Sequence, residues 1–394
     1  MATGTATKPQ AGAGQQKAQA PAAPFRVGVY GTDTPDIQVT LAATTSAQKL
    51  GTFKISPNGW LSRIECSFQG VVTTSSTYVG DQPFSGIQKV TFKDVGNREI
   101  FGPLTGYEWF TVNKWGGYFE GSADPRNPAG QYLASGTYFQ FSLFIPLEIV
   151  SRDTLGEIEN KSSSSSYTLE IYIDSIANTV TTGTAVTWTM YGSLEGYTEP
   201  EAVDSYGRPL SQSPPAAGTV QYWTSEIYNS PAGNIRYNQV NGIGYPIRTL
   251  AYVAYDAATA YPAGRSVAWT WGSNGNTAPA ANYEWPNPLT LSFGKVQLFQ
   301  RYTWQWAKFM SRWYGLNGVA TGDANLAMEN GVFVQPFTDD FDSSAGQELR
   351  NGYLITKAGN VLQISGSAYA ALNIHVLTNY VVPPGNDASK LRAR

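Results

Sequence analysis

The sequence predicts an all-β protein with short helices, built from two β-sandwich domains in tandem. Three observations lead to this expectation: the composition, a dominant period of two in the apolar positions, and a non-periodic stretch near mid-chain. The chain has 394 residues, too many for one ordinary core, and 42% of them are hydrophobic. Aromatic residues reach 13%, with 40 Gly and 23 Pro to supply turns, which favours strands over helices.

Alternation of apolar and polar residues marks the strands. In WLSRIECSF, YTLEIYID and AVTWTMY, apolar side chains recur at every second position, interrupted only by Ser62, as in strands with one face buried. The predicted inward positions are Trp60, Ile64, Cys66 and Phe68 in the first segment, Tyr167, Leu169, Ile171 and Ile173 in the second, and Val186, Trp188 and Met190 in the third.

The chain divides into five parts. Residues 1–24, made mainly of Ala, Gly, Gln, Thr and Pro, are expected to form a flexible arm. Residues 198–218 contain four prolines and few apolar residues, which indicates a linker. The two predicted domains are therefore residues 25–197 and 219–383, and residues 384–394 form a short basic tail.

Each half contains an apolar run that leads into a predicted helix. In the first half the run TYFQFSLFIPLEIV precedes SRDTLGEIEN, residues 151–160, with Ser151 as the expected N-cap. Pro146 cannot donate to a ladder, so it is expected near the end of its strand. In the second half LTLSFGKVQLF precedes YTWQWAKFMSRWY, residues 302–314.

Five aromatic and apolar side chains of the second helix fall on one face at helical spacing. This pattern favours a helix packed on a sheet over the alternative, an aromatic groove for a ligand. The residues are Tyr302, Trp306, Phe309, Met310 and Trp313.

Residues that could carry chemistry are scarce. One histidine excludes most catalytic triads and all multi-histidine metal sites, and the strand pattern ALNIHVLTNY places His375 on the face opposite Leu372, Ile374 and Val376. Cys66 is the only cysteine, so no intrachain disulfide can form, and its apolar neighbours indicate a buried side chain. No catalytic or cofactor-binding residue is predicted, and the chain is not expected to be an enzyme.

Charge and the absence of targeting signals from the sequence argue against several classes of binding partner. The net charge of −3 without a basic domain argues against direct nucleic-acid recognition. The first residues lack the apolar region of a secretory signal, and no run of 18 apolar residues exists. Three clustered aspartates could hold a cation such as Ca²⁺, although solvated loop carboxylates are the commoner case and no metal site is predicted. These are Asp339, Asp340 and Asp342.

Two β domains with matching order resemble the double jelly-roll major capsid proteins of tailless icosahedral phages with an internal membrane, the tectivirus proteins being nearest. FQFSLFIPLEIV, SRDTLGEIEN and SYTLEIYIDSI are similar to strand F, the helix and strand G of the first roll. TAVTWTMYGSLEGYTEP resembles its closing strand. In the second roll, the helix at 302–314, GVFVQPF, the hairpin from Gly352 to Ile364 and ALNIHVLTNYVVPP follow the family's order.

The resemblance covers roughly residues 45–385 and implies two eight-stranded rolls, each with a helix between strands F and G. It also implies a homotrimer that forms pseudo-hexagonal capsomers and tiles a shell over an internal membrane. The implied partners are neighbouring trimers and penton and minor capsid proteins, with the arm in possible contact with lipid. The implied location is the virion, after synthesis in the host cytoplasm. Residues 151–160 would then lie near a seam between subunits or trimers.

Low charge, at 14%, fits flanks covered by neighbouring subunits, but it equally fits a secreted β protein. The main alternative is therefore a carbohydrate-binding or carbohydrate-active secreted β-sandwich protein, in which aromatic segments such as WTWGSNG at residues 269–275 stack on sugars. A phage spike protein is a further alternative, although the fibrous repeats usual in spikes are absent from the sequence.

Overall fold

The structure is a computed structural model of the chain. The structure describes residues 25–78, 80–118, 133–149, 154–215, 217–257, 288–302, 305–306, 309, 331–338, 353–368 and 371–384. The predicted arm at 1–24 and all but the first residue of the predicted tail lie outside these ranges.

The first half of the described chain forms two facing antiparallel sheets. Its eight main strands take the letters B to I in chain order, and the two sheets have the orders B-I-D-G and C-H-E-F. The first sheet consists of β1 (Gly31–Ala42), β10 (Val186–Tyr197), β3 (Gly59–Val72) and β7 (Tyr138–Pro146). The second consists of β2 (Gln48–Lys54), β9 (Thr168–Ile173), β4 (Ile87–Lys93) and β5 (Glu99–Leu104).

Short elements complete this half. Strand β6 (Leu133–Ser135) pairs with β7, and β8 (Ile158–Asn160) pairs with the start of β3. The helices are η1 (Phe25–Val27), η2 (Phe84–Gly86), α1 (Gly106–Trp115) and α2 (Ile176–Thr179).

The second half repeats the same two strand orders. Its B-I-D-G sheet consists of β11 (Val220–Ser230), β19 (Leu372–Val382), β13 (Pro246–Asp256) and β16 (Val332–Pro336), with β17 (Leu354–Ile355) on β13. Its C-H-E-F sheet consists of β12 (Gly233–Gln239), β18 (Leu362–Ala368), β14 (Leu289–Phe293) and β15 (Val296–Arg301). Two eight-stranded double-sheet units of this topology are jelly rolls, so the predicted fold class is confirmed.

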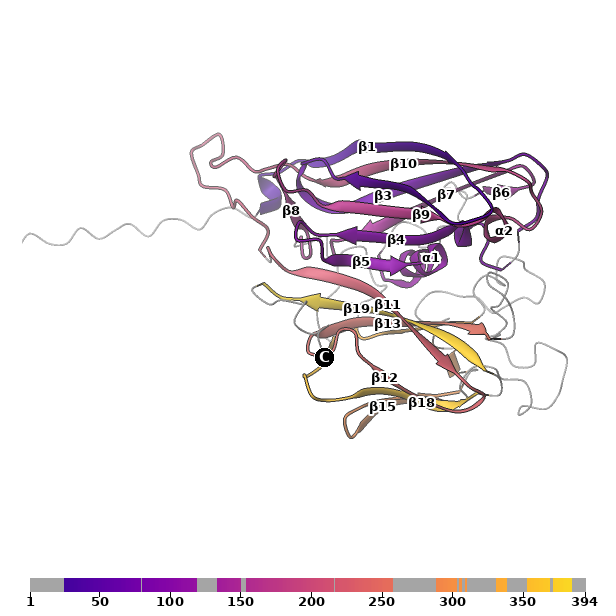
Figure 1. Cartoon of the computed structure of the whole chain (residues 1–394). Coiled ribbons are helices and arrows are strands. Elements are labelled where there is room, and N and C mark those ends of the chain that lie inside the picture. The colour runs from indigo at the N-terminus through magenta and orange to yellow at the C-terminus, as the bar shows by residue number, and fades with distance from the viewer. Residues whose placement is uncertain are drawn as a thin grey trace, which may run out of the picture.

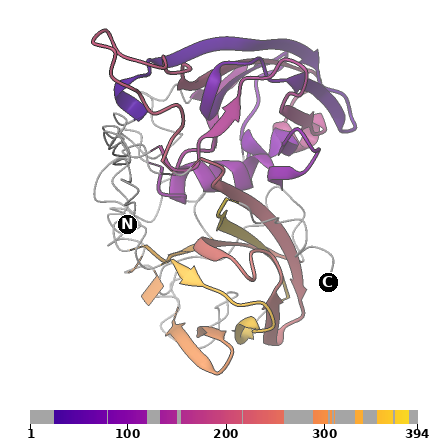
Figure 2. The same ribbon diagram turned by 90° about the vertical axis from the view of Figure 1, so that its left-hand side faces the viewer.

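The two rolls stack along the long direction of the molecule (Figure 1). They meet where β5, strand F of the first roll, lies parallel to β11, strand B of the second, with Phe101 opposite Trp223. Figure 2 shows one roll above the other, with a helix of the first roll at their junction.

The predicted inward faces are confirmed in three strands. Leu169, Ile171 and Ile173 of β9 are buried, and the intervening side chains are half-buried. Trp188 of β10 packs edge-to-face on Phe68 of β3, with ring centroids 6.1 Å apart. Such aromatic pairs fill the space between the two sheets of the first roll.

The helix between strands F and G of the first roll exists, but its predicted position was wrong. YFQFSLFIP forms β7, which is strand G and not strand F, and Pro146 is its last residue. The F–G helix is α1, from Gly106 to Trp115, well before β7. Within 151–160, the described residues from Thr154 onward form turns and strand β8, so this part of the segment is not helical, and the predicted N-cap Ser151 lies outside the described residues.

The segment 154–160 is nevertheless packed. Thr154, Leu155, Glu157 and Asn160 are each at most 2% exposed, and β8 pairs with β3 instead of extending outward. The chain after Pro146 turns back along the sandwich, because the backbone N–H groups of Leu147 and Glu148 both donate to the carbonyl of Ser62.

The second predicted helix lies mostly outside the described residues. In the part that is described, the backbone N–H of Trp306 donates to the carbonyl of Tyr302 at 3.1 Å, the spacing of a helical turn. Trp306 is fully buried and packs edge-to-face on Phe299 and Phe333, as expected for a helix on a sheet.

The hairpin predicted between Gly352 and Ile364 is wrong. Strand β17 pairs with β13 in one sheet, whereas β18 pairs with β12 and β14 in the other. The turn from Lys357 to Asn360 therefore carries the chain between the two sheets of the sandwich, with the N–H of Asn360 donating to Lys357 O at 3.1 Å.

Candidate functional site

Cys66 and His375, the two side chains considered for catalysis, lie in different environments. Cys66 in β3 is fully buried, and burial raises the pKa of its thiol, which disfavours the thiolate needed for a nucleophile. His375 in β19 lies on the face opposite Ile374 and Val376, as predicted, and contacts the first roll.

The described part of the chain contains no site formed by the residues considered for binding a metal ion, a sugar or a membrane. Asp339, Asp340 and Asp342 lie outside the described residues, as does the aromatic segment 269–275. Among the side chains that the structure describes, no three His, Cys, Asp or Glu residues gather in a way that would hold a metal ion. No helix within the described ranges has the length and apolar character needed to cross a bilayer.

The most developed polar arrangement is at the junction of the two rolls, called here the inter-roll seam. It comprises α1 and residues 116–118 of the first roll, and the facing side chains of β11, β13 and β19 of the second. All ten residues of α1 are buried, including Glu108, Asn113 and Lys114. Both rolls contribute to this burial, because α1 packs against β4, β5 and β7 of the first roll and against β13 of the second.

Helix α1 begins with a capping box. The backbone N–H of Glu108 donates to the Thr105 hydroxyl at 3.2 Å, and the Thr105 N–H donates to Glu108 Oε2 at 2.7 Å. Further along, Trp109 Nε1 and Asn113 Nδ2 both donate to the carbonyl of Phe144 in β7. These bonds fix α1 to the first roll at both ends.

The other oxygen of Glu108 reaches the second roll. Glu108 Oε1 accepts a hydrogen bond from the Ser225 hydroxyl at 2.6 Å and lies 2.8 Å from Nδ1 of His375. Burial alone would raise the pKa of Glu108, but the hydrogen bonds with His375, Ser225 and Thr105 outweigh it and lower the pKa below its usual value. The carboxylate therefore stays ionised inside the seam.

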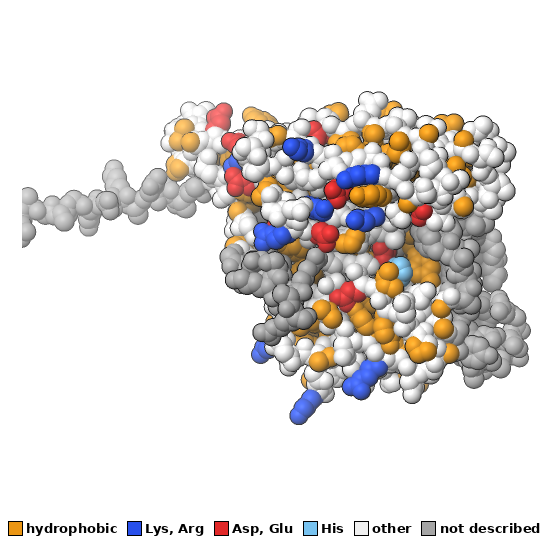
Figure 3. All heavy atoms as spheres, in the orientation of Figure 1, with side chains coloured by type: hydrophobic (Ala, Val, Ile, Leu, Met, Phe, Trp, Pro, Cys, Tyr) orange, Lys and Arg blue, Asp and Glu red, His pale blue; other side chains and the backbone are white. Residues whose placement is uncertain are grey.

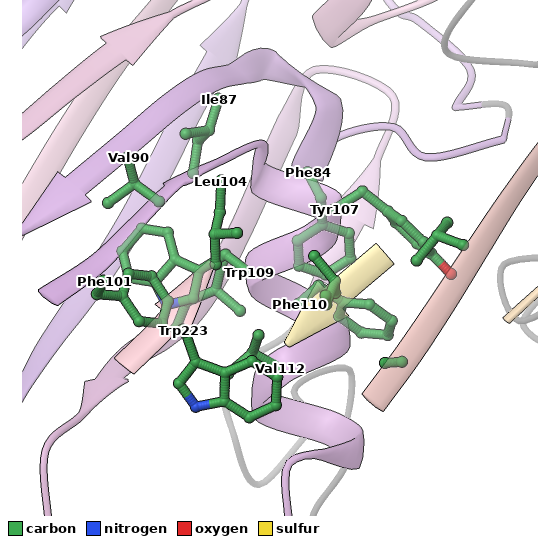
Figure 4. Packing of buried hydrophobic residues seen from close by; sticks show 14 of the residues in the cluster. Phe84, Ile87, Val90, Phe101, Leu104, Tyr107, Trp109, Phe110, Val112 and Trp223 are labelled. Carbon is green, nitrogen blue, oxygen red and sulfur yellow. The ribbon is translucent and has the colours of Figure 1, made fainter. Parts of the chain in front are cut away.

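Tyr118 makes a second polar link. Its hydroxyl accepts from Trp223 Nε1 at 2.6 Å and donates to Gln221 Oε1 at 2.7 Å, both in β11. Gln221 Nε2 in turn donates to the carbonyl of Leu147 at 2.9 Å. In Figure 4, Trp223 lies beside Val112 of α1, so the indole packs on the helix while its N–H is satisfied.

A buried arginine closes the seam on the β13 side. Arg248 is 0% exposed and donates to the carbonyls of Gly116 and Gly117 and to Asn379 Oδ1. Its guanidinium lies 5.1 Å from the ring centroid of Tyr118. The C-terminal end of α1 thus receives a cation, which its helix dipole favours.

The inter-roll seam connects the two rolls of one chain, and its side chains are not arranged as a catalytic site. Each of its polar groups described above is engaged by another group of the chain, and the chemistry is that of a rigid connection between two folded units. On the face shown in Figure 3, charged side chains gather over the first roll. In that roll, Lys49 of β2 and Lys93 of β4 both form ion pairs with Glu170 of β9.

Comparison of the fold finds similar solved structures, whereas comparison of the sequence finds no relative. No family model and no curated protein matches the chain. The major capsid protein P2 of bacteriophage PM2 is similar at a TM-score of 0.51, with 8% identity, and the likeness covers 91% of this chain and 99% of that one.

Two further structures are similar over comparable spans. The STIV MCP has a TM-score of 0.57 and 10% identity, covering 93% of this chain and 99% of that one. A chain of the PBCV-1 virus capsid has a TM-score of 0.53 and 10% identity, covering 90% and 93%. At these identities the likeness establishes the fold, which is the double jelly roll.

Proposed function

We propose that this chain is a major capsid protein without enzymatic activity. The observation that carries the proposal is the pair of jelly rolls in one chain, with the strand orders B-I-D-G and C-H-E-F in each. The solved structures similar over about nine-tenths of the chain are those of viral capsid proteins, and the likeness covers 93–99% of their own length.

The proposed building block is a homotrimer in which six rolls form a pseudo-hexagonal capsomer. The seam supports it, because Glu108, Tyr118 and Arg248 fix the angle between two neighbouring rolls within each subunit. A rigid two-roll unit is what a ring with repeating contacts requires. The low charge of the chain also suits interfaces between subunits.

The finer features are part of the same proposal. Residues 25–197 and 219–383 are the two rolls, 198–218 is the linker, and residues 1–24 and 384–394 are the terminal segments. The trimers would tile an icosahedral phage shell over an internal membrane, within reach of the N-terminal arm. Penton and minor capsid proteins would complete the virion, after synthesis of the chain in the host cytoplasm.

The experiment is native mass spectrometry of the purified full-length protein, with electron microscopy of the same sample. The expected mass is three times the chain mass of 42.7 kDa, and the expected particles have a pseudo-sixfold outline. A stable monomer would overturn the proposal, and polysaccharide binding by that monomer would favour the carbohydrate-binding alternative.

A further inference from the structure

The described chain begins with a short segment that lies against the first roll. This segment, residues 25–30, is called here the N-terminal strap; it contains η1 and leads into β1 at Gly31. The backbone N–H of Gly28 donates to the carbonyl of Phe25 at 3.0 Å and closes the turn of η1. Figure 1 shows η1, in indigo, at the end of the first roll where the linker begins.

One aromatic side chain anchors the strap. Phe25 is 2% exposed and packs edge-to-face on Trp60 and Tyr197, with ring centroids 5.8 and 6.4 Å away. By contrast, Val27 is 71% exposed and Tyr30 is 79% exposed, so these two side chains contribute little buried surface. A segment with few buried apolar contacts can open locally while the roll stays folded.

The end of the strap next to β1 is held by backbone bonds. The N–H of Thr198 donates to the carbonyl of Tyr30 at 3.0 Å, and the N–H of Tyr30 donates to the Thr198 hydroxyl at 3.0 Å. Because these bonds lie at the far end from Phe25, the Phe25 end can lift while Tyr30 stays in place. Tyr30 is therefore the natural hinge of the strap.

The strap also brings a positive charge to its contact site. The guanidinium of Arg26 donates to the Tyr197 hydroxyl and lies 4.9 Å from the centroid of the Tyr197 ring. Electrostatic interactions connect Arg26 with Glu157, and Tyr197 with both Glu148 and Glu157. The strap, one phenol and two carboxyl groups thus form a single cluster.

Glu157 is the buried acid of this cluster. It is 1% exposed, and its two oxygens have no hydrogen-bond partner in the described part of the chain. It lies two residues before Glu159, which pairs with Trp60 in the register of β8 on β3. The anchor site of Phe25 and the buried carboxyl are therefore on neighbouring strands. Burial of an unpaired carboxylate is costly, whereas a protonated carboxyl is buried at a much smaller cost.

The charged and titratable groups near Glu157 come from three elements. Glu148, after β7, disfavours ionisation of Glu157, and Arg26 of the strap favours it. Tyr197 of β10 stays neutral at working pH, because burial raises its pKa to about 12. On β8 itself, Glu159 is largely exposed and pairs with Lys161 at 3.7 Å.

We propose that the N-terminal strap is a proton-controlled latch, closed while the Glu157 carboxyl carries a proton and opened when that proton is lost to solvent. Opening lifts Phe25 from Trp60 and Tyr197 and lets water reach the carboxylate. The latch lies within one subunit, so it does not depend on the proposed trimer.

The pH range of the latch follows from proton linkage. In the closed state burial raises the pKa of Glu157 to about 9, and in the open state water restores the ordinary value of 4.5. Between these values the open state binds fewer protons, so the ratio of open to closed strap rises about tenfold per pH unit. Closure is most favourable below about pH 4.5, where both states are protonated.

Opening changes where residues 1–24 join the folded roll. In the closed state the junction is Phe25, beside Trp60, whereas in the open state it moves to Tyr30. The strap spans up to about 20 Å when it is extended. A rise in pH would therefore extend the reach of the N-terminal segment by up to that distance.

Limited digestion of the full-length protein with trypsin, followed by intact-mass measurement, tests the latch. The cut between Arg26 and Val27 requires an open strap. Glu157→Gln keeps a neutral side chain of the same shape and cannot ionise, so it cancels the pH dependence of trypsin itself. The wild-type rate of this cut, divided by the Glu157→Gln rate, should rise about 10- to 100-fold from about pH 6 to about pH 8.

Three controls accompany this measurement. Glu159→Gln changes a carboxyl two residues away whose side chain is 62% exposed, and it should keep the wild-type pH dependence. Phe25→Ala removes the anchor and should be cut rapidly at about pH 6, with little further rise. Cutting after Arg248, which is 0% exposed, reports unfolding of the rolls and should not increase with pH.

Three results would overturn the latch. The first is a wild-type to Glu157→Gln ratio that stays constant with pH. The second is a cut after Arg248 that rises in parallel with the cut after Arg26, because the pH dependence would then belong to unfolding of the whole chain. The third is a wild-type pH dependence that persists in Phe25→Ala, since Glu157 would then titrate independently of the strap.

Discussion

Glu108 Oε1 lies 2.8 Å from His375 Nδ1, and this contact links α1, which is buried between the two rolls, to β19, the last described strand of the second roll. The residues are separated by most of the length of the chain. The side chains are 3% and 14% exposed, so the pair is shielded from solvent. One carboxylate therefore caps α1 with one oxygen and holds the second roll with the other.

Replacing Glu108 with Gln should destabilise the protein at pH 7. The amide keeps the shape but loses the negative charge beside His375, and the expected loss is about 1–3 kcal/mol in the free energy of unfolding. Urea unfolding followed by tryptophan fluorescence measures it. Glu199→Gln, at a side chain that is 61% exposed, is the matched control and should change little.

The same variant has a predicted pH dependence. The pKa of Glu108 is lowered by folding from its ordinary value of 4.5, so the unfolded chain takes up the proton first. The stabilisation is complete above about pH 4.5 and is lost as the pH falls through the lowered pKa. The stability difference between wild type and Glu108→Gln should therefore shrink below pH 4.5, and a difference that grows there would contradict the assignment.

Removing the hydroxyl of Tyr118 should also loosen the seam. Tyr118→Phe leaves Trp223 Nε1 without its acceptor and Gln221 Oε1 without this donor, in a buried site. The expected destabilisation is about 1–3 kcal/mol. Tyr206→Phe, at a ring that is 83% exposed, is the control. Equal thermal unfolding midpoints for the two variants would show that the Tyr118 hydroxyl does not join the rolls.

Glu157 carries a buried carboxyl group directly before strand β8. It is 1% exposed, and neither of its oxygens has a hydrogen-bond partner among the residues that the structure describes. Burial and, to a smaller extent, the nearby charge of Glu148 raise its pKa to about 9, and the charge of Arg26 opposes the shift. The side chain is therefore protonated in the folded protein at neutral pH.

Glu157→Gln should reduce the decrease in unfolding free energy that the wild type shows as the pH rises. The folded state keeps a proton that the unfolded chain releases above its ordinary pKa of 4.5, so wild-type stability falls as the pH rises from about 4.5 to about 9. The variant lacks this titration and should be more stable than wild type at pH 8 by about 1–3 kcal/mol, but not at pH 4. Parallel stability curves from pH 4 to pH 9 would refute the raised pKa.

Much of the fold could be predicted because half-buried strands leave a period of two in the sequence. Strands β3, β9 and β10 were found in this way, and their inward residues are correct. Helix α1 was missed because all ten of its residues are buried, so GYEWFTVNKW shows no polar face. The remaining signal was Thr105 followed by Glu108, the pattern of a capping box.

The seam could not be predicted, since its members come from distant parts of the chain. The alternation in ALNIHVLTNY places His375 on one face of a strand but cannot say that α1 lies against that face. The helix expected at 151–160 was wrong for a related reason. Ser151 and the charged residues after it satisfied local capping rules, while the long-range pairing of β8 with β3 decided the structure.

A single methyl group should be enough to displace α1. A Cβ on Gly106 would lie 2.0 Å from the backbone oxygen of Phe84 and 2.8 Å from Cβ of Ile87, and backbone cannot move aside as a flexible side chain can. Gly106→Ala should therefore cost about 1–3 kcal/mol through overpacking.

The matched variant is Gly96→Ala, where the nearest atom to an added Cβ is a side-chain oxygen of Asp94 at 3.2 Å. It should be tolerated. Because α1 also holds β11 and β19, Gly106→Ala should expose amide hydrogens of both rolls at the seam to exchange, whereas Gly96→Ala should not. Faster exchange confined to the first roll would show that α1 stabilises its own roll without joining the second.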